Sequence, residues 1–188
     1  MRIGLFGGAF DPFHNGHKAI IEAAIESNLV DYVFVVPSVS SPFKPGNCLN
    51  AAPYRYYMTS DAIDEISVRH PGKVYICDVE FYLEGVSFTL KMLELLQSKR
   101  YFSAFLEKND IPFSKEDKIS FSLMCGSDIL FSFDKWFEPK KIVSLAPLMV
   151  ALRPGDDASL VPKQIEQIEA KYATNVTAFS INSIDISS

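Results

Sequence analysis

A glycine-rich turn between an apolar run and an amphipathic helix, at residues 7–17, constrains the fold of this chain more than any other feature. The run before the turn, Met1 to Phe6, predicts a short buried strand. After the turn, apolar side chains at positions 20, 21, 24 and 25 recur with helical spacing and predict a helix that begins near Asn15 and ends near Ser27. In open α/β sheets, ligands bind where a strand turns into a helix at the carboxyl end of the sheet. The sequence therefore predicts a ligand site close to its own beginning.

The turn carries residue types that suit a phosphate group. Gly7 and Gly8 let the backbone turn sharply and approach a ligand closely, because no Cβ stands in the way. His14 and His17 are three residues apart, so both rings point the same way over the amide-rich start of the helix, which attracts anions. We interpret the turn, with Phe10 in it, as a phosphate site. The alternative is a glycine-rich turn whose histidines only cap a helix.

Strand and helix patterns alternate along the rest of the chain. Apolar runs predict strands at 31–37, 74–77, 119–125, 148–152 and 175–179. Helical spacing predicts helices at 52–68, 87–99 and 161–172, with Ser87 as the N-cap of the second and a further helix start at Gly126 to Asp128. The segment 100–118 is charged and irregular, and we interpret it as an inserted surface excursion. The alternation predicts an α/β fold, a doubly wound parallel sheet of the Rossmann-like kind, in a single domain over residues 1–188.

Composition and charge exclude several function classes. Cys48, Cys77 and Cys125 are scattered without C-x-x-C spacing, so we expect neither a disulfide framework nor a protein-bound metal. A net charge of −5 argues against a nucleic-acid partner, although local basic groups can still bind small anions. The start of the chain lacks a signal-peptide pattern, and the apolar stretch 142–152 is shorter than the roughly 20 residues that span a bilayer. We expect a cytoplasmic protein without a membrane partner, and a homo-oligomer remains open.

Two later features suggest a nucleotide. Gly126-Ser127-Asp128 follows the fourth expected strand, which in a doubly wound sheet can lie beside the first. A glycine there admits a ribose or phosphate, and a carboxylate can hold ribose hydroxyls, which we favour over the alternative of a plain helix cap. Trp136, the only tryptophan, lies in a short segment beyond this turn. Its ring can stack on a heteroaromatic group, or it can simply pack in the core as large aromatic side chains usually do.

Together these motifs resemble those of the bacterial nicotinate-nucleotide adenylyltransferases, members of the H-x-G-H nucleotidyltransferase superfamily. The H-x-G-H motif itself is specific for the superfamily and much less specific for the member. The similarity covers most of the chain, through G-G-A-F-D-P-F-H-N-G-H at 7–17, S-P-F-K at 41–44, D-V-E at 78–80, G-V-S-F-T at 85–89, C-G-S-D at 125–128, L-R-P-G at 152–155 and I-D-I-S-S at 184–188.

Two positions depart from the family pattern. Phe88 stands where tyrosine is usual, so a hydroxyl contact is absent. The sequence stops at Ser188, before the threonine and arginine that complete the family's I-S-S-T-x-x-R element. We expect that the natural chain continues and that this domain is truncated within its last motif.

The resemblance implies roles for individual residues. His14 and His17 are the implied catalytic residues, which hold the ATP phosphates. The implied ATP site as a whole comprises Gly7, Gly8, Phe10, His14, His17, Gly126, Asp128, Ser187 and Ser188. The implied nicotinate mononucleotide site comprises Lys44, Ser87, Phe88, Thr89 and Trp136, and further candidates for substrate phosphate or charge balance are Arg55 and Arg153.

The implied reaction is adenylyl transfer from ATP, with Mg²⁺, to nicotinate mononucleotide, which gives deamido-NAD and pyrophosphate. The protein then has to position two anions and neutralise charge on the phosphates, and histidines with an ordinary pKa near 6.5 are expected to become cationic among them. The same chemistry on nicotinamide mononucleotide or phosphopantetheine is an alternative. A non-catalytic nucleotide-binding module of a larger protein is an alternative of another class.

Overall fold

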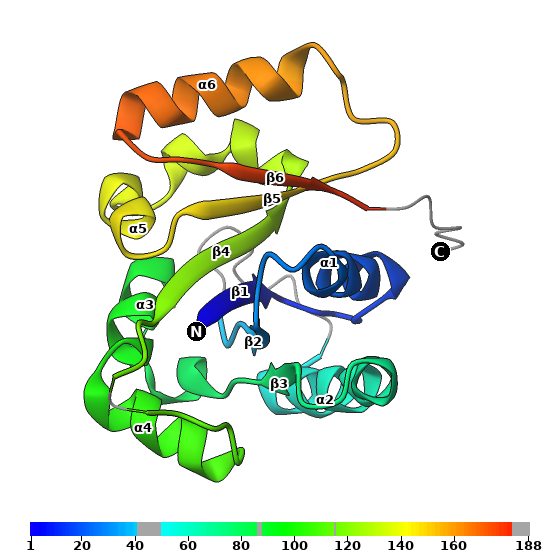
Figure 1. Ribbon diagram of the computed structural model, residues 1–188, viewed down its shortest axis with the longest axis vertical. Coiled ribbons are helices and arrows are strands. Elements are labelled where there is room, and N and C mark those ends of the chain that lie inside the picture. Colours follow the sequence, from blue (N-terminus) through cyan, green and yellow to red (C-terminus); the bar gives the residue numbers. More distant parts are fainter. Residues whose placement is uncertain (41–49, 86–87, 115, 182–188) are drawn as a thin grey trace.

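A six-stranded parallel sheet forms the centre of the computed structural model, which describes residues 1–40, 50–85, 88–114 and 116–181. The strands lie in the order β3-β2-β1-β4-β5-β6, and every neighbouring pair is parallel (Figure 1). Their bounds are β1 Arg2–Gly8, β2 Tyr32–Pro37, β3 Val74–Ile76, β4 Ser120–Gly126, β5 Leu148–Leu152 and β6 Thr177–Ser180. The doubly wound α/β fold predicted from the sequence is confirmed.

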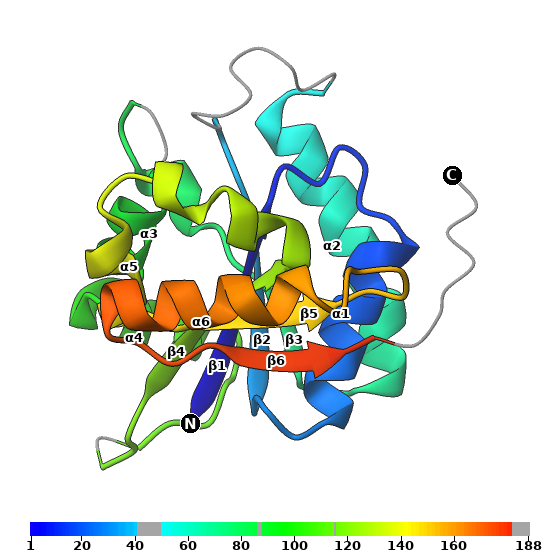
Figure 2. The same cartoon turned by 90° about the horizontal axis from the view of Figure 1, so that it is seen from above.

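Helices cover both faces of the sheet, as Figures 1 and 2 show. One face packs against α1 (Asn15–Glu26) and α2 (Ala52–Arg69). The other packs against α3 (Thr89–Leu96), α4 (Lys99–Lys108), α5 (Pro139–Leu145) and α6 (Leu160–Tyr172). Because both faces are covered, β2 and β5 are continuous apolar runs rather than alternating with polar residues. None of the helices in the described ranges is both long enough and apolar enough to cross a membrane.

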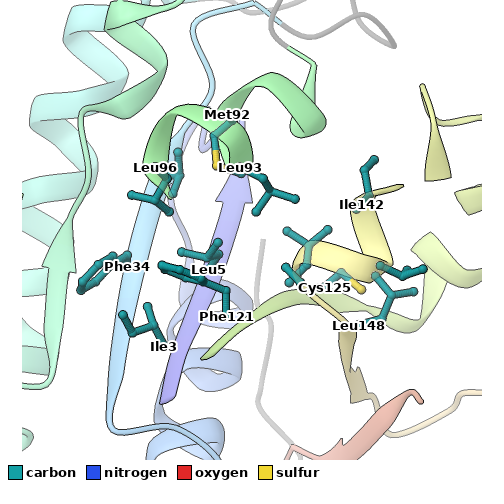
Figure 3. Packing of buried hydrophobic residues seen from close by; sticks show 14 of the residues in the cluster. Ile3, Leu5, Phe34, Met92, Leu93, Leu96, Phe121, Cys125, Ile142 and Leu148 are labelled. Carbon is teal, nitrogen blue, oxygen red and sulfur yellow. The ribbon is translucent and has the colours of Figure 1, made fainter. Parts of the chain in front are cut away.

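Successive side chains of β1 divide between the two cores. Ile3 and Leu5 point to the side of α3, where they pack with Leu93 and Leu96 (Figure 3). Phe6 belongs to the core on the side of α1. These core side chains are almost completely buried. The central strand is therefore anchored on both faces, which fixes the position of the turn that follows it.

The order of the strands reverses between β1 and β4, and this places the two glycine-rich turns at one edge. Phe6 pairs with Met124 in the parallel register, so Gly8 and Gly126 end their strands side by side. A sheet with this order has its ligand crevice where the connections leave in opposite directions from the carboxyl ends of neighbouring strands. The predicted placement of the fourth strand beside the first is confirmed.

The interpretation of residues 87–118 was wrong in its details. The helix expected at 87–99 is two helices. α3 ends at Leu96 with Gln97 as its C-cap, and Ser98 caps α4 by accepting a hydrogen bond from the Tyr101 N–H at 3.4 Å. The N-cap of α3 is Phe88, one residue beyond the predicted Ser87, which lies outside the described residues. Residues 99–108 form α4 rather than an irregular excursion, since Phe102 and Phe105 share one buried face of the helix.

The turn after β4 also differs from the expected helix start. Two short 3-10 helices, η2 (Ser127–Phe131) and η3 (Phe133–Lys135), follow this strand, and a third, η1 (Val79–Tyr82), follows β3.

Cys77 and Cys125 are buried free thiols, while Cys48 lies outside the described residues.

Candidate active site

The two histidines of the first turn close the start of α1. His14 is the N-cap residue, and its Nδ1 accepts a hydrogen bond from the Gly16 N–H at 3.1 Å. In return, Nδ1 of His17 accepts from the His14 N–H at 3.2 Å. This reciprocal pattern is a capping box with imidazoles in the places usually taken by Ser or Thr and by Glu or Gln. The histidines therefore do cap the helix, as the alternative interpretation expects. The cap uses Nδ1 of each ring and leaves Nε2 without a role in it.

The cap fixes which ring nitrogen carries the proton. Because Nδ1 of both His14 and His17 accepts a hydrogen bond, the proton of each neutral ring is assigned to Nε2. Among the described residues, neither Nε2 atom has a hydrogen-bond partner. The two rings stack with centroids 3.7 Å apart and an interplanar angle of 22°. The site therefore presents the Nε2–H donors of two stacked rings beside the amide-rich end of α1, which is an arrangement suited to phosphate oxygens.

Aromatic side chains surround His17 and determine its charge. Phe6, Phe10 and Phe13 have ring centroids 5.0 to 5.9 Å from its imidazole. This burial, together with the nearby His14 and the positive charge of Arg153, lowers the pKa of His17 to about 3. The pKa of His14 is also lowered, first by burial and then by Arg153. Both rings are neutral at pH 7 in this structure, so the cationic form expected among phosphates remains a prediction.

The two glycines of the first turn have different surroundings. A Cβ at Gly8 would lie 2.8 Å from Cε1 of the buried Phe10 ring. The backbone φ of Phe10 is 48°, and this conformation turns its side chain back toward Gly8. A Cβ at Gly7 would meet only the Val36 carbonyl at 3.9 Å. Packing thus accounts for Gly8, whereas the space around Gly7 would admit a side chain, and its predicted contact with a ligand stays a prediction. The side chain of Phe10 lies in the core beneath His17, so only its backbone faces the site.

A second group of charged residues lies at the ends of β4 and β5. Asp128 is the second residue of η2, and Arg153 directly follows β5, with 3.1 Å between Nη2 of Arg153 and Oδ1 of Asp128. The guanidinium passes over Gly126, where a Cβ would come within 2.4 Å of Nη2. Both side chains are about half exposed, so the pair contributes little to stability and can exchange its partner for a ligand. Arg153 was only a secondary candidate from the sequence, yet its charge acts on both histidines.

The candidates for the acceptor side meet through two aromatic rings. Phe88 precedes α3, and its ring centroid lies 4.9 Å from that of Phe137, which follows Trp136. The turn that ends at Thr89 and the segment of Trp136 are thereby brought together, as the resemblance implies. Trp136 is partly buried, with its ring 5.5 Å from that of Phe133, so it also packs as the structural alternative expects.

Sequence reasoning missed Phe137. This half-exposed ring is the residue that joins the two acceptor segments. The available signal was its position directly after the only tryptophan. Lys44, Ser87, Ser187 and Ser188 lie outside the described residues, and their predicted roles stay predictions.

Arg55 lies beside the site but is turned into the protein. Its side chain is 1% exposed, and its guanidinium donates to the backbone carbonyls of Ala9, Ser38, Val39 and Asn50. These carbonyls belong to the turn after β1, to the end of β2 and to the residues before α2. In this geometry Arg55 holds three segments together, and its guanidinium N–H groups already donate to backbone carbonyls.

A protein-bound metal ion would need several His, Cys, Asp or Glu side chains close together. Within the described ranges no group of three or more His, Cys, Asp or Glu side chains is placed to hold a metal ion.

Comparison with known proteins agrees with the fold and with the motifs. A family model described as cytidylyltransferase-like matches residues 5–188. A protein of Clostridium beijerinckii named "Probable nicotinate-nucleotide adenylyltransferase" is 34% identical over 187 residues, which are 100% of this chain and 83% of that protein. A protein of the same name from Clostridium acetobutylicum is 34% identical over 98% of this chain and 82% of its own length.

A solved structure is similar in fold. It is that of "Plasmodium falciparum nicotinic acid mononucleotide adenylyltransferase complexed with NaAD", with a TM-score of 0.69, 19% identity, and coverage of 98% of this chain and 77% of the other. At that identity the likeness concerns the fold alone. The family match and the two clostridial relatives carry the assignment: the chain belongs to the cytidylyltransferase-like family of nucleotidyltransferases, and within it to the nicotinate-nucleotide adenylyltransferases.

Proposed function

We propose that this protein transfers the adenylyl group of ATP to nicotinate mononucleotide, giving deamido-NAD and pyrophosphate in NAD biosynthesis. The observation that carries the proposal is the stacked histidine pair at the β1–α1 turn. The helix cap uses Nδ1 of His14 and of His17, so both Nε2–H groups remain for the phosphates of ATP. The relatives named as nicotinate-nucleotide adenylyltransferases support this acceptor.

The chemistry follows from the charges of the substrates. A phosphate oxygen of the mononucleotide attacks the α-phosphorus of ATP, a P–O bond forms, and the bond from that phosphorus to the pyrophosphate oxygen breaks. The attacking phosphate is already an anion near neutral pH, so the protein needs no nucleophile and no general base. Its task is to align the two anions and to stabilise the charge that develops on the leaving group. Mg²⁺ belongs to this proposal as part of the MgATP substrate.

On the ATP side, the pair of Asp128 and Arg153 can exchange partners when the nucleotide binds. The carboxylate accepts hydrogen bonds from ribose hydroxyls, and the released guanidinium turns to a phosphate. The carboxylate thus keeps hydrogen-bond donors, and the guanidinium keeps a negatively charged partner. The half-exposed position of both side chains keeps the cost of separating them small.

On the acceptor side, the pair of Phe88 and Phe137 offers aromatic surface for the pyridine ring. Thr89, in the first turn of α3, and Trp136 complete this side, together with the predicted Lys44 and Ser87. The choice between acid and amide acceptors depends on donors in this turn. Nicotinamide mononucleotide and phosphopantetheine therefore remain the alternative acceptors. The predicted cytoplasmic location also belongs to this proposal.

A pyrophosphate-release assay with MgATP tests the proposal directly. Nicotinate mononucleotide, nicotinamide mononucleotide and phosphopantetheine are offered separately, and we expect turnover with nicotinate mononucleotide to exceed turnover with the other two. Turnover with another acceptor only would keep the mechanism and replace the substrate. ATP binding without turnover on any acceptor would favour the non-catalytic module.

A further inference from the structure

A pocket with a volume of about 410 Å³ opens between η1 and α4, on residues that the proposed function does not use. Tyr82 of η1 forms one side, and Tyr101 and Phe105 of α4 form the other. Neither histidine of the candidate site lines it, nor do Asp128 and Arg153. Its size is within the range of about 300–1,000 Å³ that is usual for sites of small molecules.

The walls of the pocket are aromatic and flat. The rings of Tyr101 and Phe105, one helical turn apart, are nearly parallel, with an interplanar angle of 17° and centroids 6.2 Å apart. The ring of Tyr82 stands edge-on to Tyr101 at 5.6 Å and is 64% exposed. Leu95 and Ala104 add apolar lining. A planar ring placed here would cover Tyr82 and lie against Tyr101.

The charges of the pocket favour an anion. Asp78 is already neutralised, since the Tyr101 hydroxyl donates to its Oδ1 at 2.6 Å and Lys108 Nζ donates to its Oδ2 at 3.0 Å. Arg100, in contrast, has no ion pair or hydrogen bond of its side chain with any described residue. The Tyr82 hydroxyl likewise has no partner in the part of the chain that the structure describes. The free polar groups of the pocket are thus a guanidinium and a phenol, which together suit a carboxylate.

We propose that this pocket binds a small aromatic acid, with its ring over the exposed Tyr82 and against Tyr101, and with its carboxylate on Arg100. A single free guanidinium matches the charge and the bidentate geometry of one carboxylate. The lining carries two cations, Arg100 and Lys108, and one anion, Asp78, so a monoanion leaves it electrically balanced. The site is separate from the proposed active site and does not depend on the adenylyl-transfer proposal.

Titration with 4-fluorobenzoate, followed by ¹⁹F NMR, tests the proposal on the full chain, and 4-fluoro-1-naphthoate in a second titration distinguishes one ring from two. We expect saturable binding of at least one of them. Arg100→Ala and Tyr82→Ala should each weaken it, the first by about tenfold or more because a charge-assisted hydrogen-bond pair is lost. Lys99→Ala, which removes the neighbouring exposed charge on the same helix, is the matched control and should bind as the parent does. Arg100→Gln is a second variant that removes the charge and keeps most of the side chain's length. Both Arg100 variants should melt as the parent does because the side chain is on the surface.

Four results would overturn the inference. The first is that neither acid saturates below roughly 10 mM. The second is that both Arg100 variants bind the acid as the parent does, and the third is that the neutral 4-fluorobenzamide binds equally well. The fourth is that a saturating non-hydrolysable ATP analogue displaces the acid. The last result would place the ring in the catalytic site instead.

Discussion

At the scale of single residues, His14 and His17 each have two functions on two different atoms. Nδ1 satisfies a backbone N–H at the start of α1, and in the proposed function Nε2 binds the substrate. The helix start thus orients the rings without help from distant residues. A substitution can therefore be chosen that preserves one function and removes the other.

His17→Gln and His14→Asn are such substitutions. Gln is a usual third residue of a capping box, and Asn is a favoured N-cap, so both keep the helix start. We expect melting temperatures within about 2 °C of the parent, whereas turnover falls by about 100-fold or more because neither amide can become cationic among the phosphates, as an imidazole can. Pyrophosphate release and thermal melting measure the two effects. Near-normal turnover in His17→Gln would remove the catalytic role from this ring.

The lowered pKa of His17 predicts how stability depends on pH. Between pH 6.5 and about 3 the unfolded chain protonates this histidine and the folded protein does not. The unfolded state then binds more protons, so this contribution to stability is complete above pH 6.5 and is lost as the pH falls toward 3. We expect the free energy of unfolding of the parent to fall faster than that of His17→Gln, by about 1 kcal/mol per pH unit below pH 6.5. Urea unfolding of both proteins at pH 7, 6 and 5 measures this, and parallel curves would contradict it.

At the scale of elements, Arg55 joins the ends of β1 and β2 to the start of α2. Its buried guanidinium satisfies carbonyl groups of backbone segments that have no regular partners there. The loops at the carboxyl edge of the sheet are therefore held by one side chain, and the geometry of the first turn depends on it.

Arg55→Lys tests this structural role. Lysine keeps the charge but not the planar fork, so several buried carbonyls lose their donors. We expect the free energy of unfolding to fall by about 3 kcal/mol, measured by urea denaturation. If Arg55 instead served mainly to bind a substrate phosphate, the variant would keep its stability and only its KM would rise.

Sequence reasoning succeeded where contacts are local and failed where they are distant. The start of α1 and the histidine pair are encoded within residues 14–17, and their spacing alone predicted them. The close approach of Phe88 to Phe137, and of Arg153 to Asp128, depends on how elements far apart in the chain pack, which no local pattern reports. The helix α4 was missed because its charged residues concealed the apolar spacing of Phe102 and Phe105.

At the scale of the whole molecule, the candidate site lies across the line where the two halves of the sheet meet. The histidines follow β1, while Asp128 and Arg153 follow β4 and β5. A nucleotide bound to all four residues would therefore connect the two halves. Binding should stabilise the fold as a whole rather than a single loop.

A thermal-shift measurement with a non-hydrolysable ATP analogue checks this. At a concentration 100-fold above Kd, we expect a rise in Tm of roughly 5–10 °C, because only the folded state binds. His14→Asn combined with His17→Gln should reduce the rise at the same concentration. Lys99→Ala, far from these turns in the sequence, should leave it unchanged. An equal shift in the doubly substituted protein would show that the phosphates bind elsewhere.

The reciprocal cap of His14 and His17 also bears on how such a site can change over evolutionary time. Both hydrogen bonds of the cap lie within four consecutive residues, 14–17. A duplicated gene therefore inherits the whole proposed phosphate site of this turn as one short peptide. The pairs of Asp128 with Arg153 and of Phe88 with Phe137 are built from distant segments, and each can be altered without disturbing that peptide. Under the proposed function, selection can therefore exchange the molecule that receives the nucleotide while residues 14–17, which would hold the triphosphate, are inherited unchanged.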